Sequence, residues 1–123
     1  MIKFVYKILP AFISYSDVLP DGVGGQAKNI FIKILPKYKD DRGILEHELT
    51  HVKQCYRTFM FYGTLYKFNR KYRLDSEVEA YKVQLATNKE DGKEDYTDFY
   101  AKRITEMYDL DITIFEAKKL LLK

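Results

Sequence analysis

The sequence predicts a single domain that combines strands and helices, with the strands in its first third. Three observations lead to this prediction. The chain has 123 residues, a length that suits one domain. Hydrophobic residues make up 46% and charged residues 32%, a composition typical of a protein with a buried core. Segments rich in β-branched and aromatic residues end at Pro36, whereas the chain from residue 42 onward shows the three- and four-residue spacing of helices.

Two strands are predicted before Pro36. Residues 2–9 are rich in β-branched and aromatic types, with a short helix as the alternative, and residues 29–35 alternate isoleucines with other side chains. Between them, residues 16–28 contain one proline and three glycines, which is typical of a loop. Pro36 is expected to end the second strand, because proline has no N–H for the sheet ladder.

Helices are predicted for the rest of the chain. The first covers 42–59 and follows Asp40 and Asp41, which can cap its N-terminus. Its apolar residues are spaced by four, three and four: Leu45, Leu49, Val52 and Tyr56. A second strong helix covers 75–88, with its apolar stripe at Leu74, Val78, Tyr81 and Leu85. Further helical segments are expected at 60–73, 96–108 and 113–122.

Charge, cysteine content and hydropathy exclude several classes of protein. The net charge of +3 is too small to indicate nucleic-acid binding by itself. The single cysteine, Cys55, excludes an internal disulfide and fits a reducing compartment. Lys7 and Pro10 interrupt the apolar run at the N-terminus, which argues against a signal peptide. No stretch approaches the roughly 18 apolar residues of a membrane helix. We therefore expect a cytoplasmic protein, or, if a phage encodes it, one in the host cytoplasm or the virion.

Both histidines of the chain lie in one pentapeptide, H-E-L-T-H, at residues 47–51. On a helix, His47 and His51 lie about 6 Å apart along the axis and on one face. Their imidazoles can therefore bind one Zn²⁺, and Glu48 beside them can hold the water that the metal acidifies. The pattern H-E-x-x-H is typical of a zinc metallopeptidase, so we predict Zn²⁺ as the cofactor.

A catalytic zinc site needs a third protein ligand. The chain has no third histidine, so a carboxylate is expected, and the second strong helix offers Glu77 and Glu79. Glu77 shares a helix face with Tyr81, and the small Ala80 beside them allows another helix to approach closely. We prefer Glu77 as the ligand and keep Glu79 as the alternative. Cys55 is expected to be a small buried side chain rather than a ligand.

The combination of H-E-L-T-H with the later E-V-E-A-Y resembles the gluzincin clan of zinc peptidases. In that clan a glutamate from a second helix completes the metal site, in patterns such as E-x-x-x-D or E-x-x-A-D. Aligning the alanine places Glu77 on the metal-binding glutamate and Tyr81 where many members have aspartate. The sequence also resembles small, uncharacterised peptidase-like proteins of bacteria and phages with an H-E-x-x-H-x-x-Q helix, in which Gln54 matches the glutamine. The match covers about residues 29–88.

This resemblance implies a zincin-like α+β domain over residues 1–123, with a small sheet packed on the active-site helix and additional helices around it. It further implies that an edge strand of the sheet lies along the cleft, where an extended substrate can pair with it. Residues 29–35 are the expected edge strand, because they immediately precede the helix. A peptide or protein is the expected substrate.

The resemblance also implies a mechanism for peptide-bond hydrolysis. His47, His51 and Glu77 would hold Zn²⁺, and Glu48 would accept the water proton and pass it to the leaving amine. The developing oxyanion needs a further donor, for which Tyr81 is our candidate. The other candidates are Tyr72, Arg70 and Arg73.

Three alternatives remain open from the sequence. The first is a zincin-like binding or structural module with little or no turnover. The second is a nucleic-acid-associated protein that uses the basic and aromatic residues 66–73, although we expect these to be a helix with its aromatic face buried and its cations in solvent. The third concerns the helix at 113–122, whose apolar residues include Phe115 and Leu122. It is expected to cover the core, with an inhibitory lid over the cleft as the alternative.

Overall fold

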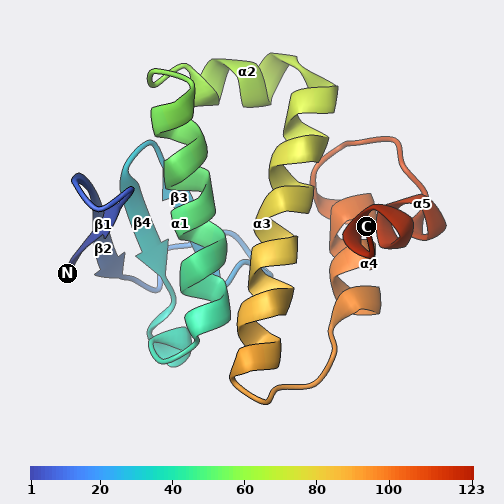
Figure 1. The fold of residues 1–123 in the computed structure, drawn as a ribbon, viewed down its shortest axis with the longest axis horizontal. Coiled ribbons are helices and arrows are strands. Elements are labelled where there is room, and N and C mark those ends of the chain that lie inside the picture. The colour runs from blue at the N-terminus through green and yellow to red at the C-terminus, as the bar shows by residue number, and fades with distance from the viewer.

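The computed structural model describes all 123 residues and shows an α+β fold in which a four-stranded sheet packs against one helix (Figure 1). The strands are β1 (Ile2–Val5), β2 (Leu9–Tyr15), β3 (Gly25–Lys28) and β4 (Phe31–Ile34). Their order in the sheet is β1-β2-β4-β3. The β1–β2 and β3–β4 pairs are antiparallel, and the β2–β4 pair is parallel. The predicted mixture of strands and helices is confirmed.

Five helices follow the sheet: α1 (Arg42–Arg57), α2 (Tyr62–Phe68), α3 (Arg70–Glu90), α4 (Thr97–Met107) and α5 (Ile114–Leu121). Figure 1 shows α1 and α3 side by side, with α2 joining them at one end. The sheet lies on the side of α1 that faces away from α3, and α4 and α5 lie on the side of α3 that faces away from α1. None of these helices has the length and apolar character that a membrane crossing requires.

One hydrophobic core lies between the sheet and α1. The predicted stripe of α1 supplies its helical side: Leu49 and Val52 are buried, and Leu45 and Tyr56 pack against them. The sheet contributes its inward-facing residues, Val5, Ala11, Ile13, Ile32 and Ile34. The Tyr56 hydroxyl also donates a hydrogen bond to the carbonyl of Pro10. Because this stripe faces the sheet, the opposite side of α1 is turned toward α3.

The N-terminal end of α1 is held close to α3. The Asp41 side chain accepts a hydrogen bond from the N–H of Ile44 at 3.1 Å, so it caps the helix as predicted. At Gly43, a Cβ atom would lie only 2.3 Å from the Asn88 side-chain oxygen of α3. Glycine at this position therefore leaves room for the Asn88 side chain against α1. Ala80 of α3 is fully buried.

A second core lies between α3, α4 and α5. It contains Tyr81, Tyr100, Ala101, Ile104, Leu110, Ala117 and Leu121. The predicted stripe of α3 takes part, since Tyr81 is buried in this cluster and the other three stripe residues pack against it. The helix α5 covers this core, as expected, but with a different face. Ala117 and Leu121 are buried, whereas Phe115 and Leu122 are exposed.

Two predictions about the strands are wrong: the extent of the first strand and the edge position of the second. Residues 2–9 do not form one strand, because the chain turns at Tyr6 and Lys7, which have positive φ angles of 50° and 70°, and then returns as β2. A composition rich in strand-forming residues cannot show where such a run bends. The segment 29–35 does contain β4, but β4 lies inside the sheet and is not an edge.

The edge strand beside α1 is instead β3, which lies in the segment predicted to be a loop. Its sequence, Gly-Gln-Ala-Lys, has no β-branched or aromatic residue and therefore carries no strand signal of its own. It becomes a strand because it pairs with β4, with Ala27 opposite Ile32. This correction moves the expected substrate-pairing edge from residues 29–35 to β3.

Candidate metal centre

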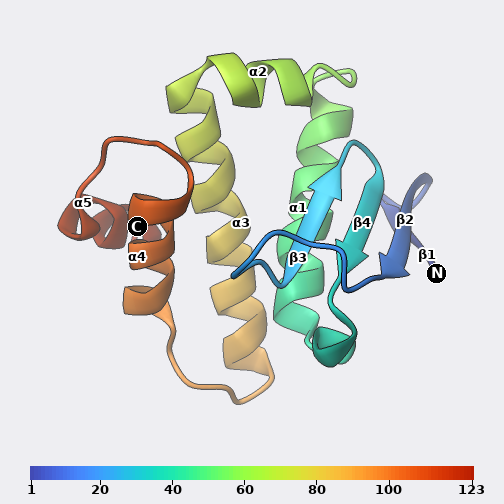
Figure 2. The same cartoon turned by 180° about the vertical axis from the view of Figure 1, so that it is seen from behind.

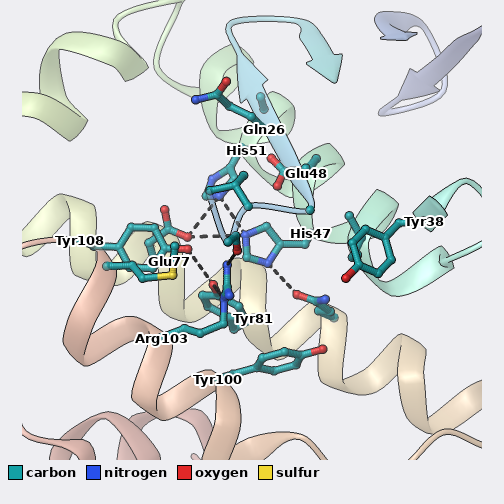
Figure 3. Close-up of a pocket in the computed structure, with 18 of the residues that line it drawn as sticks. Gln26, Tyr38, His47, Glu48, His51, Glu77, Tyr81, Tyr100, Arg103 and Tyr108 are labelled. Carbon is teal, nitrogen blue, oxygen red and sulfur yellow. Dashed lines mark hydrogen bonds and ion pairs between the residues drawn. The ribbon is translucent and has the colours of Figure 1, made fainter. Parts of the chain in front are cut away.

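Three buried side chains converge between α1 and α3 (Figure 3). His47 and His51 come from α1, and Glu77 comes from α3. The two Nε2 atoms are 3.2 Å apart, and Oε1 of Glu77 lies 3.5 Å from Nε2 of His47 and 3.3 Å from Nε2 of His51. Each side chain is at most 7% exposed. The three residues therefore form a group that could hold a metal ion.

The local sequence explains this convergence. His47 and His51 are one helical turn apart, so their rings lie on one face of α1, beside the stripe that packs on the sheet. Glu77 lies on the face of α3 that meets α1, three residues before the fully buried Ala80. The structure thus brings Glu77 into the group, whereas Glu79 points elsewhere. Glu79 accepts hydrogen bonds from Arg57 and Gln54 and is partly exposed.

The outer nitrogen of each histidine is held by a glutamine. Nδ1 of His47 lies 2.9 Å from Oε1 of Gln84, and Nδ1 of His51 lies 2.9 Å from Oε1 of Gln54. The Gln54 amide is oriented by its own NH₂ group, which donates to the carbonyl of Ser76 at 3.0 Å. Its oxygen must therefore accept from Nδ1–H of His51. A proton on Nδ1 leaves the Nε2 lone pair directed at the centre of the group.

The inner atoms of the group lack a hydrogen-bond donor. Oε1 of Glu77 is the one buried side-chain oxygen or nitrogen without a hydrogen-bond partner. It faces two imidazole nitrogens that also present lone pairs when Nδ1 carries the proton. Leaving such an oxygen unpaired costs about 1–3 kcal/mol or more. A cation among the three atoms removes this cost, and the two-nitrogen, one-oxygen donor set is one that zinc takes in catalytic sites. The residues therefore fit a metal.

A proton is the other cation that fits. Burial lowers the pKa of His51, but the facing Glu77 carboxylate outweighs it and raises this pKa to about 9. Burial in turn would raise the pKa of Glu77, but His51 and His47 hold it well below its usual range. Without a metal, His51 is thus an imidazolium at neutral pH and pairs with an ionised Glu77.

The helix α2 contributes two tyrosines to the same group, which the sequence did not predict. Tyr66 donates a hydrogen bond to Oε2 of Glu77, the oxygen that faces away from the histidines. The Tyr62 hydroxyl lies 3.0 Å from Nδ1 of His51. Burial raises the pKa of both hydroxyls far above the usual value, so they stay protonated. The two tyrosines are four residues apart on a short helix before α3, and this spacing was the sequence signal that could have indicated that they share one face.

Glu48 lies next to the group and against β3. It is 6% exposed, and burial raises the pKa of its carboxyl group, while the neighbouring histidines act in the opposite sense. A Cβ atom on Gly25 would lie 3.2 Å from Cγ of Glu48, so glycine allows the edge strand to approach this side chain closely. Glu48 is therefore placed between the three converging side chains and the sheet edge.

A cavity of about 1120 Å³ opens onto this group. Its walls come from residues 20–29, which include β3, and from the helices α1, α3 and α4. Residues of α2 also contribute. Figure 2 shows β3 in front of α1, with the β2–β3 connection running across toward α3. No residue of α5 lines the cavity, so the lid expected as an alternative for this helix is wrong.

Tyr81 lies beside His47, but its hydroxyl has partners. Its ring centroid is 4.4 Å from that of His47 in an edge-on arrangement. The hydroxyl lies 2.6 Å from the hydroxyl of Tyr108 and accepts a hydrogen bond from Nε of Arg103 at 3.2 Å. Burial raises the pKa of Tyr81, so it is a neutral donor at neutral pH. Its catalytic role stays a prediction.

The other oxyanion candidates lie outside the cavity. None of Tyr72, Arg70 and Arg73 lines it. Arg73 instead donates to the backbone carbonyls of Tyr66, Lys67, Tyr108 and Asp109. The arginine that does line the cavity is Arg103 of α4, which the sequence reasoning missed. Gln84 was missed as well, although it lies seven residues after Glu77, on the same face of α3.

Two further expectations concern residues outside the group. Cys55 is fully buried, and its sulfur lies 3.5 Å from that of Met60, so it is a small core side chain as expected. In the segment 66–73, Tyr66 and Arg73 make the contacts described above, but Phe68 is 77% exposed, so the expected aromatic face is only partly buried. The expectation that nucleic acid is not a partner remains a prediction.

Comparisons of this chain with protein families, with curated proteins and with solved structures gave no match. The function must therefore be inferred from the geometry of the site.

Proposed function

We propose that the protein is a zinc-dependent peptidase of the gluzincin type. The observation that carries the proposal is the set of three lone-pair donors converging on one buried point, with a further carboxyl group beside them in an open cavity. A purely structural zinc site is usually closed by four protein ligands, whereas three ligands leave a position for water. His47, His51 and Glu77 are the proposed ligands.

The proposed metal supplies an acidified water and polarises the carbonyl of the scissile bond. The protein's own residues supply the rest. Gln54 fixes the tautomer of His51, Oε1 of Gln84 contacts Nδ1 of His47, and Tyr66 restrains the second oxygen of Glu77. These contacts hold the ligands in place before substrate arrives.

Glu48 is the proposed general base. It lies on the cavity side of the ligand group, where it can accept a proton from the attacking water and pass it to the leaving amine. Burial supports this role, because a carboxyl group with a raised pKa is a stronger base than an exposed one. Tyr81 is the proposed donor to the oxyanion, and it would have to exchange a present partner for that role.

The strand β3 is the proposed site where the backbone of the substrate binds. It is an edge strand, it lines the cavity, and it lies against Glu48 through Gly25. An extended peptide can add to such an edge by backbone hydrogen bonds, with little dependence on its side chains. A peptide bound in this way would have its scissile bond beside the proposed base.

Substitution of Glu48 by glutamine tests the proposal. The wild-type protein loaded with zinc should hydrolyse casein or mixed peptides, and a chelator should stop it. Glu48→Gln should keep its zinc and lose at least about a hundredfold in turnover, because the general base is gone while the ligands remain. Glu46→Gln, a change on the same helix outside the cavity lining, is the matched control.

Two results would contradict the proposal. Hydrolysis by Glu48→Gln at the wild-type rate would remove Glu48 from the mechanism. A zinc-loaded wild-type protein that binds peptides but never cleaves them would favour the binding module over the peptidase.

A further inference from the structure

Arg103 is a cation of the cavity without an acidic partner. Three basic residues line the cavity: Lys28, Lys93 and Arg103. Lys93 is 3.2 Å from a carboxylate oxygen of Asp41, and Lys28 is exposed to solvent. Arg103 is only partly exposed, and both of its hydrogen bonds go to neutral oxygens. A half-buried guanidinium without a carboxylate is uncommon, because its charge is only partly solvated.

The Arg103 side chain is held in one orientation. Its Nε donates to the Tyr81 hydroxyl at 3.2 Å, and its Nη2 donates to the carbonyl of Gly22 at 3.1 Å. The Phe99 ring lies 5.7 Å from its central carbon. Its Nη1 makes no hydrogen bond within the protein and is not sealed from solvent. The guanidinium therefore has N–H donors available for a ligand, and its orientation is fixed by the two hydrogen bonds.

The free guanidinium lies close to the proposed metal centre. Figure 3 shows Arg103 rising from α4 toward His47, with Tyr81 beside it. One side chain links Arg103 to His47. The Tyr81 hydroxyl accepts a hydrogen bond from Nε of Arg103, and the Tyr81 ring contacts the His47 ring. The strand β3 and Glu48 approach the same centre from α1's side of the cavity. A peptide lying on β3 could thus place one of its groups on Arg103 near the scissile bond.

We propose that Arg103 binds a carboxylate of the substrate, next to the bond that is cleaved. This inference rests on the proposed peptidase function. A guanidinium fork matches a carboxylate in geometry and charge, and such pairs are stronger than neutral hydrogen bonds. The carboxylate can come from the C-terminus of the peptide or from an Asp or Glu side chain. A neutral amide of the same shape cannot serve as well, because its NH₂ group faces the guanidinium donors.

The first test uses the unmodified, zinc-loaded protein. Four matched libraries of randomised short peptides are compared: a free-acid or amidated C-terminus, each with Asp and Glu present or replaced by Asn and Gln. Cleavage is read by mass spectrometry. We expect at least about tenfold faster cleavage, at low substrate concentration, of libraries that offer a carboxylate. Preference for the free-acid terminus or for the acidic side chains identifies the source. Equal cleavage of all four libraries would overturn the inference.

The second test assigns the preference to Arg103. Arg103→Met should abolish the preference and mainly raise KM, and Arg103→Lys should restore part of it. Lys102→Met removes the same charge from an exposed neighbouring position and should leave the preference intact. Zinc content is measured for each variant, because a substrate carboxylate could also bind the metal. A preference that survives in folded, zinc-loaded Arg103→Met would overturn the assignment.

Binding measurements separate this inference from the peptidase proposal. The same libraries are retained on immobilised, zinc-loaded Glu48→Gln protein with Arg103 present or replaced by Met. Carboxylate-selective retention that requires Arg103 supports the inference even if the wild-type protein cleaves nothing. Cleavage without carboxylate selectivity in either assay supports the peptidase and overturns the inference. If Arg103→Met does not fold, the library comparison with the wild-type protein still decides.

Discussion

At the scale of single residues, Oε1 of Glu77 is the atom on which the site depends. It is buried, it has no hydrogen-bond donor, and it lies within 3.5 Å of two imidazole nitrogens. Without a metal, only a proton on a histidine can pair with it, and the raised pKa of His51 reflects this pairing. The same three atoms can hold either a proton or a metal ion, so the two compete.

Replacing Glu77 tests this assignment directly. Glu77→Gln should lower zinc affinity by about tenfold to hundredfold or more, the loss that even residues supporting a ligand can produce. The matched control is Glu79→Gln, two positions along the same helix and bonded to Arg57 and Gln54 instead. Competition with a zinc-binding dye gives both affinities. A larger loss in Glu79→Gln than in Glu77→Gln would place the third ligand at Glu79.

At the scale of elements, the pairing of α1 with α3 sets the distance between the ligands. The contact at Gly43 and Asn88 fixes one end of this pair, and the Asn88 amide also donates to the Tyr100 hydroxyl of α4 at 2.9 Å. The helices carry apolar stripes on opposite sides, toward the sheet and toward α4 and α5. Their shared face is left for polar residues, which is where the histidines and glutamate lie.

Gly43→Ala is expected to be destabilising. Its Cβ would lie 2.3 Å from Asn88 Oδ1, so either the Asn88 side chain must leave its hydrogen bond to Tyr100 or one of the helices must shift, at a cost of about 1–3 kcal/mol. Gly63→Ala is the control, because a Cβ there meets nothing within 4 Å and alanine favours the helix α2 by up to about 1 kcal/mol. Urea unfolding measures both free energies. Equal stability of Gly43→Ala and wild type would contradict the close contact.

The elements also show how far the sequence could be read. The stripes of α1 and α3 were predictable because each spacing reflects burial on one side of its own helix. The strand β3 was not, because its pairing with β4 rather than its composition makes it a strand. Arg103 was not predictable either, since its place in the cavity depends on how α4 packs across α3. The local spacing of residues shows which side of one helix is buried. Contacts between elements that are distant in the sequence can be known only from the folded structure.

At the scale of the whole molecule, the stability of the protein should depend on pH, because His51 at the proposed metal centre titrates. The pKa of His51 is about 9 in the folded state against 6.5 for the free side chain. Its contribution to the stability of the metal-free protein is therefore fully present below pH 6.5 and is lost as the pH rises to about 9. The raised pKa of Glu48 has the same effect, because it also lowers the stability of the folded state as the pH increases.

Thermal unfolding of the chelator-treated protein between pH 6.5 and 9 measures this effect. We expect the melting temperature to fall across this range, and the rise in melting temperature on adding zinc to grow, because the metal no longer displaces a proton from His51. His51→Gln should flatten the fall seen without metal. A melting temperature that rises with pH in the metal-free wild type would contradict the pairing of His51 with Glu77.

The central claim is that His47, His51 and Glu77 together bind one metal ion. Elemental analysis of the purified protein, alongside His47→Ala, tests it most directly. We predict close to one equivalent of zinc per chain in the wild type and a large loss in His47→Ala. Less than a tenth of an equivalent in the wild type after incubation with zinc, or the same zinc content in both proteins, would contradict the claim.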